Sequence, residues 1–79
     1  MTLYQFKMLD VDEQYDVVLN KSGIFVDNFI NGSQRFNLYA IAKFFVEVEY
    51  SVKENRIINL RAFKTGDLLD KYSNINGLI

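Results

Sequence analysis

The spacing of apolar and polar residues changes once along the chain, close to Gly23. Before this glycine, apolar residues recur every three or four positions, which is the period of a helix. After it, apolar and polar residues alternate, most strictly in Val46-Glu47-Val48-Glu49-Tyr50, which is the period of a strand. The pattern therefore predicts a helical part over residues 1–22 and an antiparallel sheet over residues 23–64.

Two short helices are expected in the amino-terminal part. Thr2 is suited to cap the first, and Asp10 with Glu13 has the spacing of a capping box for the second. Gly23 is suited to the left-handed residue that ends a helix. A strand over 15–19 is the alternative, because this stretch contains two β-branched valines. The residues expected on the buried helix faces are Leu3, Phe6 and Leu9, and then Val11, Tyr15, Val18 and Leu19.

Four strands are expected after Gly23, over residues 24–30, 34–40, 44–51 and 57–63. Asn31-Gly32-Ser33 separates the first two, with Gly32 supplying a positive φ angle. Asn55 is suited to the same conformation in the last turn. The segment 65–73 is predicted to form a last helix carrying Leu68, Leu69 and Tyr72, followed by a frayed tail over 74–79. The fold class is α+β in a single domain, 1–79, with two short N-terminal helices, a four-stranded antiparallel β-meander and a short C-terminal helix.

The strand register is predicted by burying as many apolar side chains as the alternation allows, because a slip of one residue exchanges the two faces. This criterion places Val48 opposite Leu60, Leu38 opposite Val46, and Val26 opposite Leu38. The first hairpin is the least constrained, because a two-residue turn would shift its parity. The resulting core face contains Ile24, Val26, Phe36, Leu38, Val46, Val48, Ile58, Leu60 and Ala62, with Ile58 opposite Tyr50 and Ile24 opposite Ala40.

The other face of this predicted sheet is divided into an aromatic row and a polar end. The aromatic row is Phe25, Tyr39, Phe45 and Phe63, and the charged residues predicted beside it are Arg35, Asp27, Glu47 and Arg61. Glu47 is expected opposite Arg61, and Arg35 beside Glu49. We interpret these eight residues as an interface, because contiguous apolar patches mark binding surfaces. The alternative is that the last helix covers the row.

The amino-acid composition limits the kinds of catalytic and metal site that the protein can form. The chain has no cysteine and no histidine, so the commonest nucleophile–base pairs and metal ligands are missing. We therefore expect no enzymatic activity, no cofactor and no metal site. The net charge of −1 argues against a surface for duplex nucleic acid. No signal peptide or membrane-spanning segment is recognisable, so a cytoplasmic location is expected.

The sequence thus predicts a small protein–protein interaction module that self-associates, as a homodimer, or binds a protein partner. Two alternatives remain open. The same face could bind a small ligand or single-stranded nucleic acid by stacking on its rings. A chain of this size and acidity is also compatible with an immunity or antitoxin-like neutralising protein.

Overall fold

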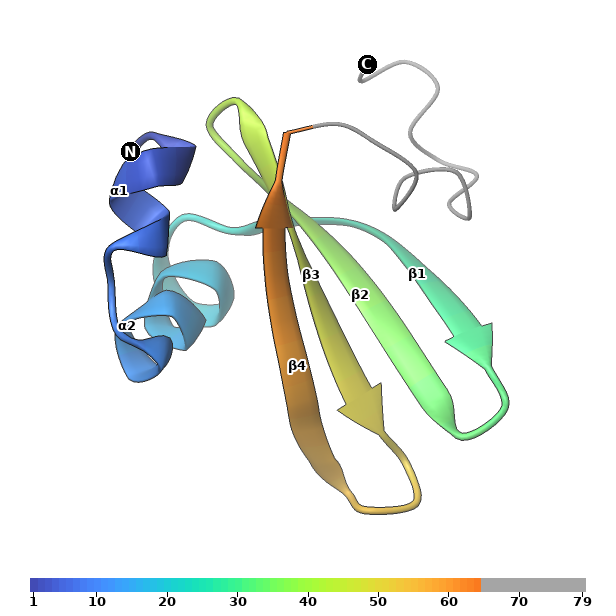
Figure 1. Cartoon of the computed structure of the whole chain (residues 1–79). Helices are drawn as coiled ribbons and strands as arrows, with labels where there is room; N and C mark the ends of the chain where they lie inside the picture. Colours follow the sequence, from blue (N-terminus) through green and yellow to red (C-terminus); the bar gives the residue numbers. More distant parts are fainter. Residues whose placement is uncertain (65–79) are drawn as a thin grey trace.

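The computed structural model describes residues 1–64, which form two helical segments followed by a sheet (Figure 1). The predicted last helix, 65–73, and the frayed tail, 74–79, lie outside the described residues. The elements in chain order are α1 (Leu3–Lys7), α2 (Val11–Asp16), the π-helical turn η1 (Val17–Lys21), β1 (Ile24–Asn31), β2 (Gln34–Ile41), β3 (Phe44–Ser51) and β4 (Arg56–Phe63).

Both predicted helix starts are confirmed. The Gln5 backbone N–H donates to the Thr2 hydroxyl at 3.1 Å, and the Thr2 N–H donates to the Gln5 side chain at 2.9 Å. Asp10 and Glu13 form the same reciprocal pair at the start of α2. Each box satisfies two backbone donors that have no partner inside the helix.

The end of the helical part differs from the prediction. A π-turn, in which Ser22 N–H donates to the Val17 carbonyl at 2.8 Å, rotates the last residues relative to α2. Val18 is consequently buried, whereas Val11 and Leu19, predicted on the same face, are exposed. Nor does Gly23 have the positive φ expected of it. It is required by close packing, since a Cβ atom there would lie 2.0 Å from the Val18 carbonyl oxygen.

An exposed ion pair joins α2 to η1. The Asp16 carboxylate accepts hydrogen bonds from the Lys21 ammonium at 3.0 Å and the Asn20 amide at 3.1 Å. These bonds, that of Lys21 first, lower the pKa of Asp16 below its usual value. A carboxyl with a lowered folded-state pKa stabilises the fold at neutral pH and loses that contribution as the pH falls through the lowered pKa.

The four strands form one antiparallel sheet in the order β1-β2-β3-β4, so the predicted meander is confirmed. The β3–β4 register is also confirmed, with Val48 opposite Leu60 and Glu47 opposite Arg61. Beyond Glu49 the register shifts by one residue. The predicted pairing of Tyr50 with Ile58 is therefore wrong: Tyr50 lies opposite Ile57, and Ile58 is the extra residue of a bulge.

The predicted β2–β3 register is wrong by one residue. Leu38 lies opposite Glu47 rather than Val46, because the hairpin closes through a two-residue turn, Ala42-Lys43. The shorter turn brings Ile41 opposite Phe44, and both side chains are buried on the helix-covered face. The Phe44 ring centroid lies 5.5 Å from that of Phe6 in α1. The observed register thus brings Ile41 and Phe44 into the core, where Phe44 packs against α1.

The β1–β2 register changes part-way along the hairpin. Ile24 lies opposite Ala40 as predicted, but Asp27, not Val26, lies opposite Leu38, so Val26 is the extra residue of a second bulge. Because β1 pairs with β2, the one-residue slip between β2 and β3 also exchanges the faces of the β1 residues that precede the bulge. Predicted core residues that instead lie on the face away from the helices are Ile24, Val26, Phe36 and Leu38.

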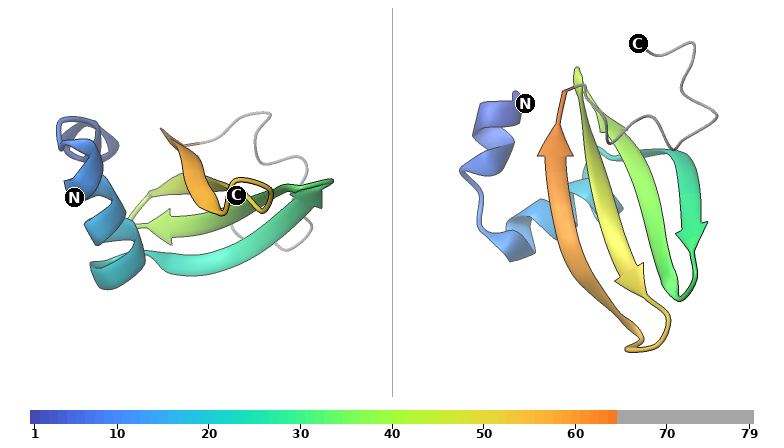
Figure 2. Two further views of the ribbon diagram at one scale, coloured as in Figure 1. Left: turned by 90° about the horizontal axis from the view of Figure 1, so that it is seen from below. Right: turned by 45° about the vertical axis from the view of Figure 1, so that its right-hand side comes forward.

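Each face of the sheet carries an apolar cluster. On the helix-covered face the buried residues are Phe6, Val18, Ile41, Phe44, Val46 and Val48, flanked by half-buried Leu3, Leu9, Val17, Tyr39, Ile57, Leu60 and Ala62. On the opposite face, called the far face here, Leu38 and Phe45 are buried among Val26, Phe29, Phe36, Ala40 and Phe63. Figure 2 shows both helical segments on one side of the sheet. Within residues 1–64, no helix is long and apolar enough to cross a membrane.

Candidate interaction surface

The structure does not place the four rings of the predicted aromatic row on one face. Phe25 and Tyr39 lie on the helix-covered face, because Tyr39 is opposite Val46. Phe45 and Phe63 lie on the far face. The prediction of a continuous row is therefore wrong, and its cause is the one-residue slip between β2 and β3.

The row is replaced by two aromatic pairs. The rings of Phe25 and Tyr39 meet edge to face, with centroids 5.9 Å apart and planes at 77°. Those of Phe45 and Phe63 are stacked, with centroids 6.2 Å apart and planes at 30°. Both arrangements are favourable for aromatic side chains. Phe45 is buried, whereas Phe25 is 56% exposed, so only the first pair offers a largely accessible ring.

The four predicted charged residues are divided in the same way. Asp27, Glu47 and Arg61 lie on the far face, in one row across the sheet with Leu38 between the two acids. Arg35 lies on the helix-covered face opposite Tyr50, so its predicted contact with Glu49 is wrong. No single rim of four charges is formed.

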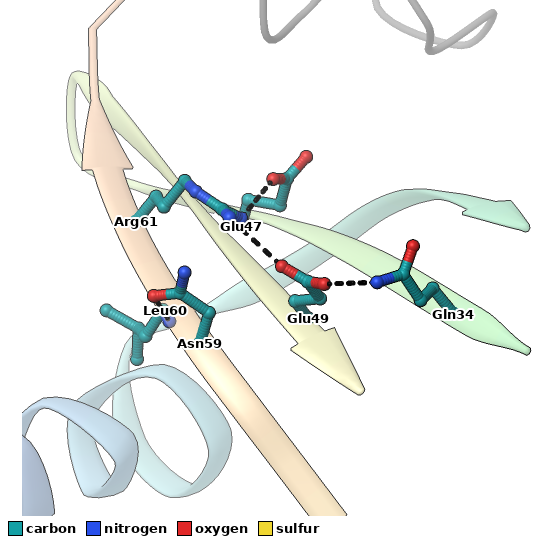
Figure 3. A network of polar contacts seen from close by, with 6 residues as sticks. All are labelled: Gln34, Glu47, Glu49, Asn59, Leu60 and Arg61. Carbon is teal, nitrogen blue, oxygen red and sulfur yellow. Dashed lines mark hydrogen bonds and ion pairs between the residues drawn. The ribbon is translucent and has the colours of Figure 1, made fainter. Parts of the chain in front are cut away.

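Arg61 holds a polar network on the far face (Figure 3). One guanidinium nitrogen donates to Glu47 at 3.1 Å and the other to Glu49 at 3.0 Å. The second oxygen of Glu49 accepts from the Gln34 amide at 3.1 Å. The Glu47 side chain is fully buried and that of Glu49 is 8% exposed, while Arg61 retains access to solvent.

This network explains how two adjacent carboxylates are tolerated in the sheet. Buried carboxylates require charged partners and hydrogen bonds, and a guanidinium supplies several donors in one plane. Arg61 binds both carboxylates through separate nitrogens. Among residues 1–64, no group of three or more acidic, histidine or cysteine side chains is arranged to hold a metal ion. The observed contacts are those of a structural ion-pair network.

Within residues 1–64, the two helical segments cover only part of the helix-covered face. Burial decreases towards the sheet edge: Val46 and Val48 on β3 are buried, whereas Phe25 and Ile30 on β1 are each 56% exposed. We call the part that these helical segments leave exposed the open strip. It consists of three cross-strand rows, Phe25 with Tyr39, Asn28 with Asn37, and Ile30 with Arg35. Asn28 and Arg35 are exposed, and Asn37 and Tyr39 are half-buried.

A hollow of about 350 Å³ lies beside the β2–β3 turn. Among residues 1–64, its wall combines apolar side chains with two lysines, Lys43 and Lys64, and includes no carboxylate. Its lining residues are Met1, Thr2, Leu3, Ala42, Lys43, Phe44 and Lys64.

No protein-family model, curated protein or solved structure matches this chain.

Sequence reasoning found three of the six residues of the open strip, Phe25, Tyr39 and Arg35, and missed Asn28, Ile30 and Asn37. Asn37 was missed because the predicted register of β2 placed it on the other side of the sheet. Asn28 and Ile30 were missed because they share the alternation of Ile24 and Val26, whose face was predicted to be core, whereas the predicted interface lay on the opposite face. A usable signal was the pair Ile41 and Phe44. Two large apolar residues flanking two others favour a two-residue turn, because that turn buries both.

Proposed function

We propose that this protein is a non-enzymatic protein–protein interaction module that docks its partner on the open strip. The observation that supports the proposal is the exposure of Phe25 and Ile30, two large apolar side chains on a sheet face that is elsewhere covered. Burying one such side chain contributes about 1.5–3 kcal/mol. Two of them, with Tyr39 beside Phe25, are enough to anchor a small interface.

The edges of the sheet are less suited to docking. Both edge strands carry a bulge, at Val26 in β1 and at Ile58 in β4. A bulge interrupts the row of backbone donors and acceptors that a new strand would need, and proteins use bulges to prevent edge pairing. We therefore assign the contact to side chains of the face, not to strand addition.

The other candidate surfaces fit less well. Phe45 is buried and Phe63 half-buried on the far face, so their truncation would primarily lower stability. Stacking of single-stranded nucleic acid on Phe25 and Tyr39 would have Arg35 as the one cation of the strip, which is a weak attraction for a phosphate backbone. A protein partner, unlike a nucleic acid, does not require a positively charged surface.

A photo-crosslinking experiment tests this function. Benzoylphenylalanine is incorporated in place of Phe25 in the native host cell, and in place of Val52 as a control, since Val52 is an exposed apolar residue outside the strip. We expect a discrete protein adduct from position 25 and none from position 52. The absence of an adduct at position 25, or equal adducts from both positions, would contradict the proposal.

A further inference from the structure

The open strip has a chemical pattern that suits a second copy of itself. Each of its three rows pairs one residue of β1 with a different residue of β2: ring with ring, amide with amide, and isoleucine with arginine. In a two-fold symmetric interface the same patch is used by both subunits, so its parts must complement each other. The rows meet this requirement if β1 of one copy faces β2 of the other.

We infer that the partner of the open strip is a second copy of this chain, related by a two-fold axis parallel to the strands and lying between β1 and β2. This inference rests on the proposed function. Under this symmetry every row faces its own counterpart with the two strands exchanged. Phe25 packs on Tyr39 of the second copy, Asn28 on Asn37, and Ile30 on the aliphatic stem of Arg35.

The polar residues support this axis. An amide side chain is both donor and acceptor, so Asn28 of one copy and Asn37 of the other hydrogen-bond reciprocally. Arg35 faces Ile30 of the second copy and not a second Arg35, so no like charges are apposed. A single arginine per strip therefore does not oppose self-association.

The position of the helices on the sheet is consistent with the same two-fold axis. The core that α1 and η1 build lies over β3, β4 and the end of β2, where Ile41, Val46 and Val48 are buried. A two-fold axis between β1 and β2 places the helices of the two copies on opposite sides of the interface. The two uncovered halves then face each other at the spacing of packed sheets, about 10 Å.

The small size of the strip sets the expected affinity. Three rows bury less surface than a standard interface, so the total lies below about 1,200 Å² and the complex belongs with weak, transient ones. We expect dissociation in the micromolar to millimolar range. Association must therefore be followed over concentration, not at a single low value.

Sedimentation of the purified chain, combined with charge substitutions at Ile30, tests the inference. The wild type is expected to pass from monomer to dimer between about 5 µM and 1 mM. Ile30→Arg places a cation against Arg35 of the second copy and should weaken the dimer about ten-fold or more. Ile30→Glu places an anion there, and its dimer should be retained or tightened. The double variant Ile30→Arg/Arg35→Glu carries the charge pair of Ile30→Glu with the two signs exchanged and should restore association to within about three-fold of wild type.

Controls separate this outcome from others. Val52→Arg introduces the same charge at an exposed apolar site outside the strip and should leave the dimer unchanged. Circular dichroism of each variant should match the wild type, because Ile30 is exposed in the monomer. A chain that remains monomeric, or a dimer that Ile30→Arg and Ile30→Glu weaken equally, would overturn the inference. The crosslink at position 25 distinguishes the two proposals. An adduct whose mass differs from that of two copies of this chain would support the interaction function and contradict the homodimer.

Discussion

Arg61 is the residue on which the polar part of the far face depends. Its guanidinium bonds to Glu47, which has no exposed side-chain surface, and to Glu49. A second arginine, Arg56, makes an ion pair with Glu54 at 3.3 Å in which both side chains are more than half exposed. The two arginines lie on the same strand, so they provide a matched comparison of a buried and a solvated pair.

Replacing Arg61 by methionine is expected to lower the free energy of unfolding by about 3 kcal/mol. Methionine preserves the apolar stem but leaves Glu47 buried without the guanidinium. Arg56→Met should change stability by less than about 1 kcal/mol, because the exposed pair contributes little. Urea denaturation of both variants measures the difference. Equal losses would show that the network on the far face does not stabilise the fold.

At the scale of elements, the two tight hairpins close in the same way with different residues. Each has a two-residue turn whose first residue has a positive φ, 62° at Gly32 and 50° at Ala42. Glycine adopts this conformation freely, whereas a residue with a Cβ atom is strained by about 1 kcal/mol. The β2–β3 hairpin therefore forms although its turn residues oppose it locally.

Ala42→Gly is expected to raise the free energy of unfolding by about 1 kcal/mol, because it removes this strain. Ala40→Gly, within β2, should lower it by about 0.5–1 kcal/mol, since glycine weakens a strand. Thermal unfolding of the two variants gives the comparison. If Ala42→Gly destabilises the protein as Ala40→Gly does, the left-handed turn is not a source of strain.

These turns also explain what could be predicted from the sequence. Gly32 and Asn55 signalled their turns, and the strict alternation of β3 predicted its pairing with β4, including Glu47 opposite Arg61. Nothing in Ala42-Lys43 signalled a turn, and the preference that decided it, the burial of Ile41 and Phe44 against α1, acts between distant residues. For the candidate site, the sequence indicated Phe25, Tyr39 and Arg35 but placed them beside the wrong neighbours.

At the scale of the whole molecule, the helices attach to the sheet through apolar side chains packed on the helix-covered face. Phe6 is the one residue of α1 that is fully buried, and its ring packs against Phe44 at the start of β3. Tyr4, on the opposite side of the same helix, is 72% exposed. The docking of α1 therefore depends chiefly on Phe6, with half-buried Leu3 packed against the same cluster.

Phe6→Ala is expected to lower the free energy of unfolding by about 3–5 kcal/mol through lost burial and the cavity left behind. A chain of this length has a total stability of only about 4–12 kcal/mol, so the variant should be partly unfolded at 37 °C. Tyr4→Ala should change stability by less than about 0.5 kcal/mol. Both are followed by urea denaturation. A small loss in Phe6→Ala would mean that the sheet is stable without α1.

The strand order has a consequence for the rate of folding. Every strand pairs only with its neighbours in the chain, so the sheet assembles from hairpins that close over short loops. The contact of α1 with β4, by contrast, joins the two ends of the described chain and closes the longest loop. The helices should therefore dock after the rate-limiting step. Destabilising changes in α1, such as Leu3→Ala, should then speed unfolding while leaving the refolding rate nearly unchanged.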